Sequence, residues 1–202
     1  MSLVRIPLTT SESYAQKYRN NETVYASLEL NQVAFPQTGM VVSQVPLGTA
    51  FTVSAPCENG MWVVADKAAG AINAPAAATD KPIGIVYTTE KEYDDRHYGL
   101  QYFRQVAGEY PRVGILGLGD TVTTNCLQYD DTVFANFAAI KTYVEGGSTA
   151  HVIISSGSTF SKAIPQVVKA LPNGYTGIYG KVVKVYTMPN GEAGIKYQIV
   201  NL

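Results

Sequence analysis

The side chains that could do acid–base chemistry or bind a metal are few in this 202-residue chain, and they are densest in one short segment. That segment reads Glu90-Lys-Glu-Tyr-Asp-Asp-Arg-His-Tyr98 and contains His97, one of two histidines. Adjacent residues of an extended loop point in different directions, and no second patterned group of ligands accompanies them. We therefore interpret this segment as a solvated loop with local ion pairs.

The second histidine, His151, opens an apolar stretch and is followed by Ser155, Ser156 and Ser158. A Ser-His-Asp hydrolase would have to use His97 or His151, but the chain has no G-x-S-x-G nucleophile elbow. A hydrogen-bonded imidazole on a buried strand is the simpler interpretation of His151. We predict no enzymatic activity and no catalytic residue.

Metal and cofactor sites are also not indicated. The pairs Asp94, Asp95 and Asp130, Asp131 lack the alternating oxygen ligands and the glycine of an EF-hand loop. Cys57 and Cys126 have no CxxC partner and no nearby histidine, so zinc is disfavoured. We predict two buried free thiols; a disulfide between them would stabilise the fold by roughly 4 kcal/mol, but a reducing compartment argues against it.

A nucleotide site is suggested by Gly117 and Gly119, which form a GxG in front of Asp120. A dinucleotide fingerprint needs a third glycine and the start of a helix, so that backbone N–H groups meet the phosphate. Here Thr121-Val-Thr-Thr124 continues as a strand instead. We predict a tight bend between strands and no bound cofactor.

Aromatic side chains offer a different chemistry. Trp62 and the 14 tyrosines could form a platform on which sugar rings pack, or they could lie at subunit contacts. For individual tyrosines we favour ordinary half-buried strand positions.

Composition limits the partners. Charged residues make up 15% of the chain and the formal net charge is -1, so nothing attracts a nucleic-acid backbone or an anionic membrane. Leu30 to Cys57 has no charge, but Pro36, Pro46 and Pro56 make it unsuitable as a bilayer helix. The first residues lack the apolar core of a signal peptide, so we expect synthesis in a cytoplasm.

Short strands separated by turns dominate the pattern, which predicts a mainly β fold: a small β-barrel or sandwich body with an extended N-terminal arm and a C-terminal β-hairpin. Asn59-Gly60 suggests a type I′ hairpin turn. The expected strands are Met40 to Val45, Phe51 to Ala55, Met61 to Ala65, Ile83 to Tyr87, Val113 to Leu118, His151 to Ser155, and the final pair Lys181 to Met188 and Ile195 to Val200 around the turn Pro189 to Glu192.

Other segments are less regular. The alanine-rich run from Ala68 to Ala78 contains Gly70, Asn73 and Pro75 and predicts a surface loop, which we expect to lie against a neighbouring subunit. Asp130 to Val144 fits a helix capped by Asp130 or Asp131, or a strand, equally well. A short helix is expected from Ser11 to Arg19.

We divide the chain into an arm (1–35), a β-barrel-like body (36–130) and a second β segment packed on that body (131–202). The final hairpin, with Ile195, Tyr197 and Ile199 on one face, is expected to cap or close the sheet.

Four segments resemble the head decoration, or auxiliary capsid, proteins of tailed bacteriophages. They are Asn59 to Asp66, Lys81 to Val86, Pro111 to Leu116 and Gly119 to Asn125. The resemblance implies a virion structural protein that is made in the host cytoplasm, binds the major capsid protein on the outer capsid surface, and often forms a homotrimer at a local threefold axis. It supplies no catalytic motif.

Two alternatives stay open: a head-fibre, tail or baseplate component that contacts the host, and an envelope carbohydrate-binding or hydrolytic domain using Trp62, Asp94 and Asp95.

Overall fold

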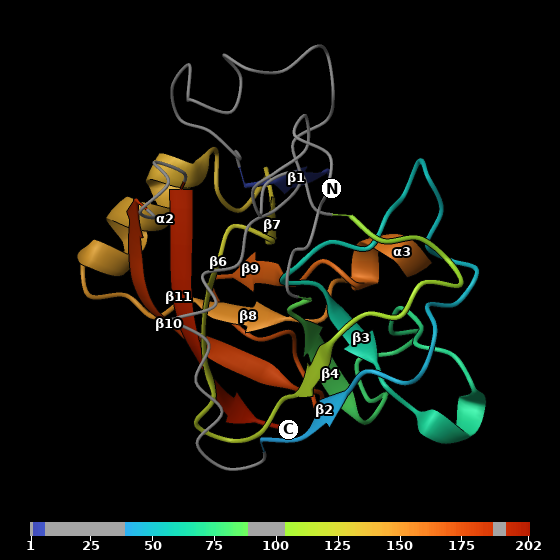
Figure 1. Ribbon diagram of the computed structural model, residues 1–202. Helices are drawn as coiled ribbons and strands as arrows, with labels where there is room; N and C mark the ends of the chain where they lie inside the picture. The colour runs from blue at the N-terminus through green and yellow to red at the C-terminus, as the bar shows by residue number, and fades with distance from the viewer. Residues whose placement is uncertain (1, 7–38, 89–103, 188–192) are drawn as a thin grey trace.

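The computed structural model describes residues 2–6, 39–88, 104–187 and 193–202, and these are mainly β, as predicted. They form one seven-stranded and one four-stranded sheet that pack against each other, and they do not close into a barrel (Figure 1). The predicted helix at 11–19, the loop at 90–98 and the turn at 189–192 lie outside the described residues.

The seven-stranded sheet, sheet A, has the order β1-β7-β9-β8-β10-β11-β6 and takes strands from all three predicted divisions of the chain. All its neighbouring strands are antiparallel except β7 and β9, which are parallel. Its strands are β1 (Leu3–Arg5), β6 (Thr121–Thr124), β7 (Gln128–Asp130), β8 (His151–Ile153), β9 (Gln166–Val168), β10 (Tyr179–Thr187) and β11 (Ala193–Asn201).

The four-stranded sheet, sheet B, has the order β2-β5-β4-β3 and is antiparallel throughout. Its strands are β2 (Val41–Val42), β3 (Trp62–Val64), β4 (Ile83–Val86) and β5 (Val113–Ile115). Three short helices complete the described structure: the 3-10 helix η2 (Lys67–Ala69), α2 (Phe137–Glu145) and α3 (Thr159–Lys162).

Strands β3, β4 and β5 of sheet B are enclosed on both faces, because successive strand residues point to opposite sides and each side meets a core, whereas Val41 of β2 is exposed. On β3, Trp62 joins the core shared with sheet A, whereas Val63 joins a second core with Phe51 and Ile72 under the loops. Sheet A uses only its inner face in this way: that face carries the shared core, and α2 covers part of it through Ile140. Among the described residues, the outer face of sheet A is therefore a broad sheet surface that neither core covers.

The predicted hairpin at Asn59-Gly60 is wrong in its pairing, although the turn itself exists. Met61 N donates to Glu58 O, which closes a turn, but β3 then pairs with β4, whose residues lie 19 to 23 positions further along. Phe51 to Ala55 forms no strand, since Thr52 and Ala55 bridge each other in a local turn. Gly60 has a φ of 95°, and a Cβ there would lie 2.6 Å from Cys126 Cβ, so only glycine fits this turn.

Strand lengths and the alanine-rich run also differ in part from expectation. Only Val41–Val42 of the segment 40–45 and Val113–Ile115 of the segment 113–118 are strands. The run 68–78 is irregular after η2, as predicted, but it is not wholly a surface loop, because Ile72 is 0% exposed and packs in the second core.

The segment 130–144 proves to be partly helical, and the predicted cap is wrong. Asp130 ends strand β7, while Asn136 caps α2 by accepting a hydrogen bond from Ala139 N at 2.9 Å. Asp130 belongs to a strand rather than to the helix because β7 pairs with two strands that are distant in sequence, β1 and β9.

Both ends of the chain contribute to sheet A. The C-terminal hairpin of β10 and β11 is confirmed, with Ile195, Tyr197 and Ile199 buried on one face, but it lies inside sheet A and does not close it. The expected arm begins with β1, which pairs with β7, and Ile6 directly after it is fully buried. The arm's remaining residues up to position 35 lie outside the described residues.

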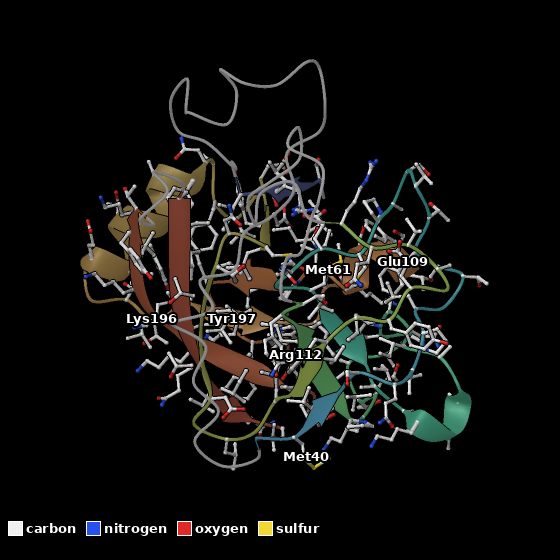
Figure 2. The ribbon with its side chains drawn as sticks, viewed as in Figure 1. Met40, Met61, Glu109, Arg112, Lys196 and Tyr197 are labelled. Atoms are coloured by element: carbon white, nitrogen blue, oxygen red, sulfur yellow. The ribbon has the colours of Figure 1, made fainter. Side chains whose placement is uncertain are left out.

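One hydrogen bond joins the two sheets through their shared core. Trp62 Nε1 on β3 donates to the Tyr197 hydroxyl on β11 at 2.9 Å, and the two rings meet edge to face at 6.0 Å. Both side chains are 0% exposed, and Tyr197 lies near the middle of the molecule (Figure 2). Because burial disfavours the phenolate, the pKa of Tyr197 is raised. The hydroxyl therefore stays neutral and available to this bond.

We predict that Tyr197→Phe lowers the free energy of unfolding by about 1–3 kcal/mol, because it leaves the buried Trp62 N–H without an acceptor. Trp62 is the only tryptophan, so urea unfolding followed by its fluorescence reports directly on this contact. Tyr179→Phe, at a half-buried position on the outer face, is the matched control and should change the free energy by less than about 0.5 kcal/mol. Equal effects of the two substitutions would contradict a special role for the bond.

Candidate functional site

Several residues singled out by their chemistry prove to have structural roles. Gly117 and Gly119 form the predicted bend: Asp120 N donates to Gly117 O, and Gly117 N donates to Asp120 Oδ2 at 2.6 Å. Burial raises the pKa of Asp120, an effect that the Gly117 hydrogen bond opposes. Strand β6 follows directly at Thr121, as expected.

The two cysteines are buried and unbonded, which confirms the prediction of free thiols. Burial raises the pKa of Cys57 well above its usual value and that of Cys126 to about 12. Neither sulfur is a thiolate at neutral pH, so neither is a ready nucleophile or metal ligand. Within the described ranges, no group of three or more His, Cys, Asp or Glu side chains is arranged to hold a metal ion.

Trp62 cannot serve as a carbohydrate platform, because it lies entirely in the core. Tyr179 and Tyr186 are half-buried on β10, as expected for strand tyrosines, whereas Tyr129 and Tyr197 are fully buried. Asp94, Asp95 and His97, the other residues proposed for chemistry, lie outside the described residues.

His151 lies on the outer face of sheet A, half-buried rather than buried. Burial lowers its pKa, Lys181 on the neighbouring strand lowers it further, and a hydrogen bond with the Lys169 backbone opposes both. Its ring packs edge to face on Tyr179 at 5.8 Å, and its Nδ1 has no hydrogen-bond partner.

The serines do not complete a hydrolytic site in the described part of the chain. Ser155 Oγ accepts a hydrogen bond from Gly157 N, and Ser158 Oγ bonds to Ser161 Oγ. These are local turn contacts, so His151 and the serines are not brought together as base and nucleophile.

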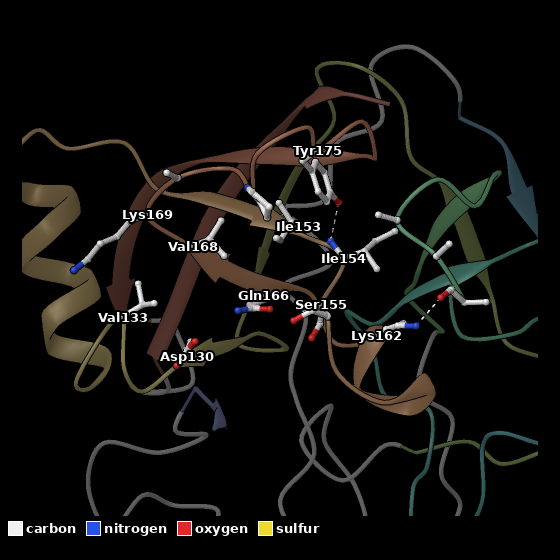
Figure 3. A pocket seen from close by; sticks show the side chains of 16 residues that line it. Asp130, Val133, Ile153, Ile154, Ser155, Lys162, Gln166, Val168, Lys169 and Tyr175 are labelled. Atoms are coloured by element: carbon white, nitrogen blue, oxygen red, sulfur yellow. Dashed lines mark hydrogen bonds between the residues drawn. The ribbon is translucent and has the colours of Figure 1, made fainter. Parts of the chain in front are cut away.

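The outer face of sheet A carries a groove of about 570 Å³, which we call the sheet A groove (Figure 3). Its floor is formed by residues that point away from the core on adjacent strands β7, β9 and β8: Asp130, Gln166, Val168 and Ile153. Its walls come from α3, the segment 170–175 and residues 76–78 of the alanine-rich run.

Two contacts hold these walls in place. The Tyr175 hydroxyl accepts a hydrogen bond from Ile154 N at 3.2 Å and donates to Ile178 O at 2.9 Å, which ties the segment 170–175 to the end of β8. Lys162 Nζ donates to Ala76 O at 2.6 Å and so ties α3 to the alanine-rich run. The groove therefore depends on contacts among segments that are distant in sequence.

The outer face beyond the groove is basic. Lys181 lies opposite His151, and Lys184 lies opposite Lys196 on β11, although like charges placed directly across a strand pair are unfavourable. The sequence contains no acidic residue from Gly146 to Gly191, yet it has Lys162, Lys169, Lys181 and Lys184 there. That asymmetry is the sequence signal from which this basic face could have been identified.

Asp130 is the acidic residue of the groove. Its Oδ1 accepts hydrogen bonds from Thr132 Oγ1 at 2.7 Å and Thr132 N at 2.9 Å, whereas its Oδ2 is buried and has no partner. The hydrogen bonds from Thr132 lower the pKa of Asp130, so the carboxylate is charged at neutral pH. The adjacent Asp131 is exposed.

No family model, curated protein or solved structure matches this chain. Among the described helices, none is long and apolar enough to span a bilayer.

We predict that the His151 imidazole titrates below its ordinary pKa of 6.5 and that Lys181→Gln raises this pKa by removing a neighbouring positive charge. Burial remains in the variant, so the pKa should not return fully to 6.5. Lys184→Gln, further along β10, is the matched control and should change it less. The His151 pKa in the native protein and in both variants can be measured by following the imidazole NMR resonances as a function of pH.

The sign of the stability effect follows from the same shift. The folded-state pKa is lowered, so His151 contributes stability above the unfolded pKa of about 6.5 and loses it as the pH falls toward the folded pKa. That loss should be smaller in Lys181→Gln. A His151 pKa above 6.5 would show that burial and Lys181 do not control this side chain.

Proposed function

We propose that this protein is a virion structural protein that binds the outer surface of an icosahedral phage capsid and stabilises it by non-covalent contacts. On this proposal its partner is the major capsid protein, it works on the capsid surface, and it transforms no substrate.

The arrangement of the segments that carry the resemblance supports the proposal. Asn59 to Asp66 contains β3, Lys81 to Val86 contains β4, and Pro111 to Leu116 contains β5. These three strands lie side by side in sheet B as β5-β4-β3. Three of the four matching segments are thus neighbours in one sheet, whereas the fourth, Gly119 to Asn125, contains β6 at the edge of sheet A.

The observation that carries the proposal is the outer face of sheet A. It is a broad sheet surface that combines exposed lysines, the exposed apolar Val200, the half-buried Tyr179 and Tyr186, and a groove with an unpartnered carboxylate oxygen. Polar, aromatic and apolar groups mixed in this way are typical of surfaces that bind other proteins.

The mechanism that we propose is adhesive. Each copy makes modest contacts with the lattice, and the repetition of those contacts over the shell multiplies their effect. Capsid subunits bridged in this way separate less readily under internal pressure.

We predict that shells lacking this protein rupture at lower temperature or lower applied force than complete shells, and that adding the purified protein restores their resistance. Heating with a dye that reports genome release measures the first quantity, and indentation by atomic force microscopy measures the second. Equal resistance with and without the protein would contradict a stabilising role.

Lysine labelling maps the face that binds. Acylation of Lys181 and Lys184 on the outer face should slow when the protein is bound to shells, whereas Lys67 in η2, on the side of sheet B, should react at an unchanged rate. Protection of Lys67 alone would assign binding to the opposite side of the molecule.

The expected assembly is a homotrimer, as the resemblance implies. Light scattering on the purified protein should give about three times the 21.8 kDa chain mass. A stable monomer would contradict the trimeric form of the proposal and leave single copies as the binding unit.

A further inference from the structure

Asp130 in the sheet A groove has one carboxylate oxygen without a hydrogen-bond partner. Asp130 is 1% exposed, and both hydrogen bonds from Thr132 go to Oδ1. Its Oδ2 is buried without a partner, although buried polar atoms in folded proteins nearly always have one. The hydrogen bonds from Thr132 keep Asp130 ionised, so Oδ2 can accept a hydrogen bond from a ligand that carries a donor.

The two lysines of the groove do not supply that donor. Lys162 Nζ is bonded to Ala76 O, and Lys169 Nζ lies over the rings of Phe134 at 5.0 Å and Tyr143 at 5.7 Å. Both side chains are directed away from the middle of the groove, toward its two ends (Figure 3). In the described structure, Asp130 forms no ion pair with either of them.

The surroundings of Asp130 are suited to an aliphatic chain. Val133, Val168 and Ile153 line the groove beside it, and Gln166 adds one polar side chain to the floor. The registers of β7 and β9 place Val168 next to Asp130. A long side chain with an apolar stem and a cationic head meets both features, because lysine and arginine pack their methylenes on apolar surface and keep the charge at the tip.

We propose that the sheet A groove binds a lysine or arginine side chain of a partner protein, with its cationic head on Asp130 Oδ2 and its stem along Val133 and Val168. The site rests on the geometry alone; that the partner is a capsid subunit rests on the proposed function. A calcium ion is the competing occupant, but it needs six to eight oxygen ligands, and the described residues gather no cluster of three acidic side chains here.

The test uses small probes and the full chain. N-acetyl-lysine-N-methylamide is titrated into the protein and followed by NMR chemical shifts, with N-acetyl-norleucine-N-methylamide as the uncharged control of the same stem. We expect the lysine probe to bind with a dissociation constant on the order of 1 mM and to shift the amides around Val133 and Val168, and we expect the norleucine probe not to bind.

Asp130→Asn should weaken binding of the lysine probe about tenfold or more, because the cationic head loses its charged acceptor. The amide oxygen can still accept from Thr132, so the fold should be retained, which an unchanged unfolding transition verifies. Glu145→Gln, an exposed carboxylate of α2 that does not line the groove, is the control and should bind the probe as the native protein does.

Val168→Lys tests the same site independently, because it leaves Asp130 in place. The introduced ammonium group would lie beside Asp130 and occupy the site from within, so the probe should no longer bind. Unaltered probe binding in this variant would overturn the proposal.

Equal binding by Asp130→Asn, equal binding of the norleucine probe, no binding of the lysine probe, or a response of the Asp130 region to calcium chloride alone would each overturn the proposal. Failure of the protein to reinforce shells would leave these results unchanged, so the two proposals fail separately.

Discussion

The contact between Trp62 and Tyr197 is the constraint on which the rest of the structure depends, because it joins the two sheets at the centre of their shared core. An indole N–H and a phenol hydroxyl, both fully buried, can each be satisfied only if β3 and β11 keep one relative position. Strands β3, β4 and β5 of sheet B are then enclosed on both faces, and the inner face of sheet A is occupied by the shared core. Among the described residues this leaves the outer face of sheet A as a broad sheet surface outside both cores, and it is the face to which we assign partner binding.

Local rules explain why part of this fold could be predicted from the sequence. The alternation of Ile195, Tyr197 and Ile199 with polar residues marks a half-buried strand, and the structure has that strand with those residues buried. The bend at Gly117 and Gly119 and the burial of the cysteines were equally predictable. Each depends on a residue's own conformational freedom or polarity, or on its near neighbours in the chain.

What could not be predicted depends on pairing between distant segments. A turn at Asn59-Gly60 suggests a hairpin, but the turn residues do not determine which strand accepts β3, and β4 competes successfully because Ile83 and Ile85 join the same core as Trp62. The candidate site was missed for the same reason. Asp130 resembles a helix cap in sequence, and it becomes a groove residue only because β7 is inserted between β1 and β9.

The first residues of the chain are part of that insertion, which gives them a role beyond that of an arm. Leu3 pairs directly with Asp130, and Ile6 is buried in the shared core. Arg5 makes a two-pronged ion pair with Glu58, with Nη2 and Oε2 3.1 Å apart, so β1 is fastened to the turn that precedes β3. β1 pairs with β7 and so helps to position Asp130, the carboxylate that we assign to partner binding. β1 is itself held by the ion pair between Arg5 and Glu58, and Glu58 lies in the turn before strand β3 of sheet B. The position of the groove therefore depends on contacts with both sheets, although all the strands of its floor belong to sheet A.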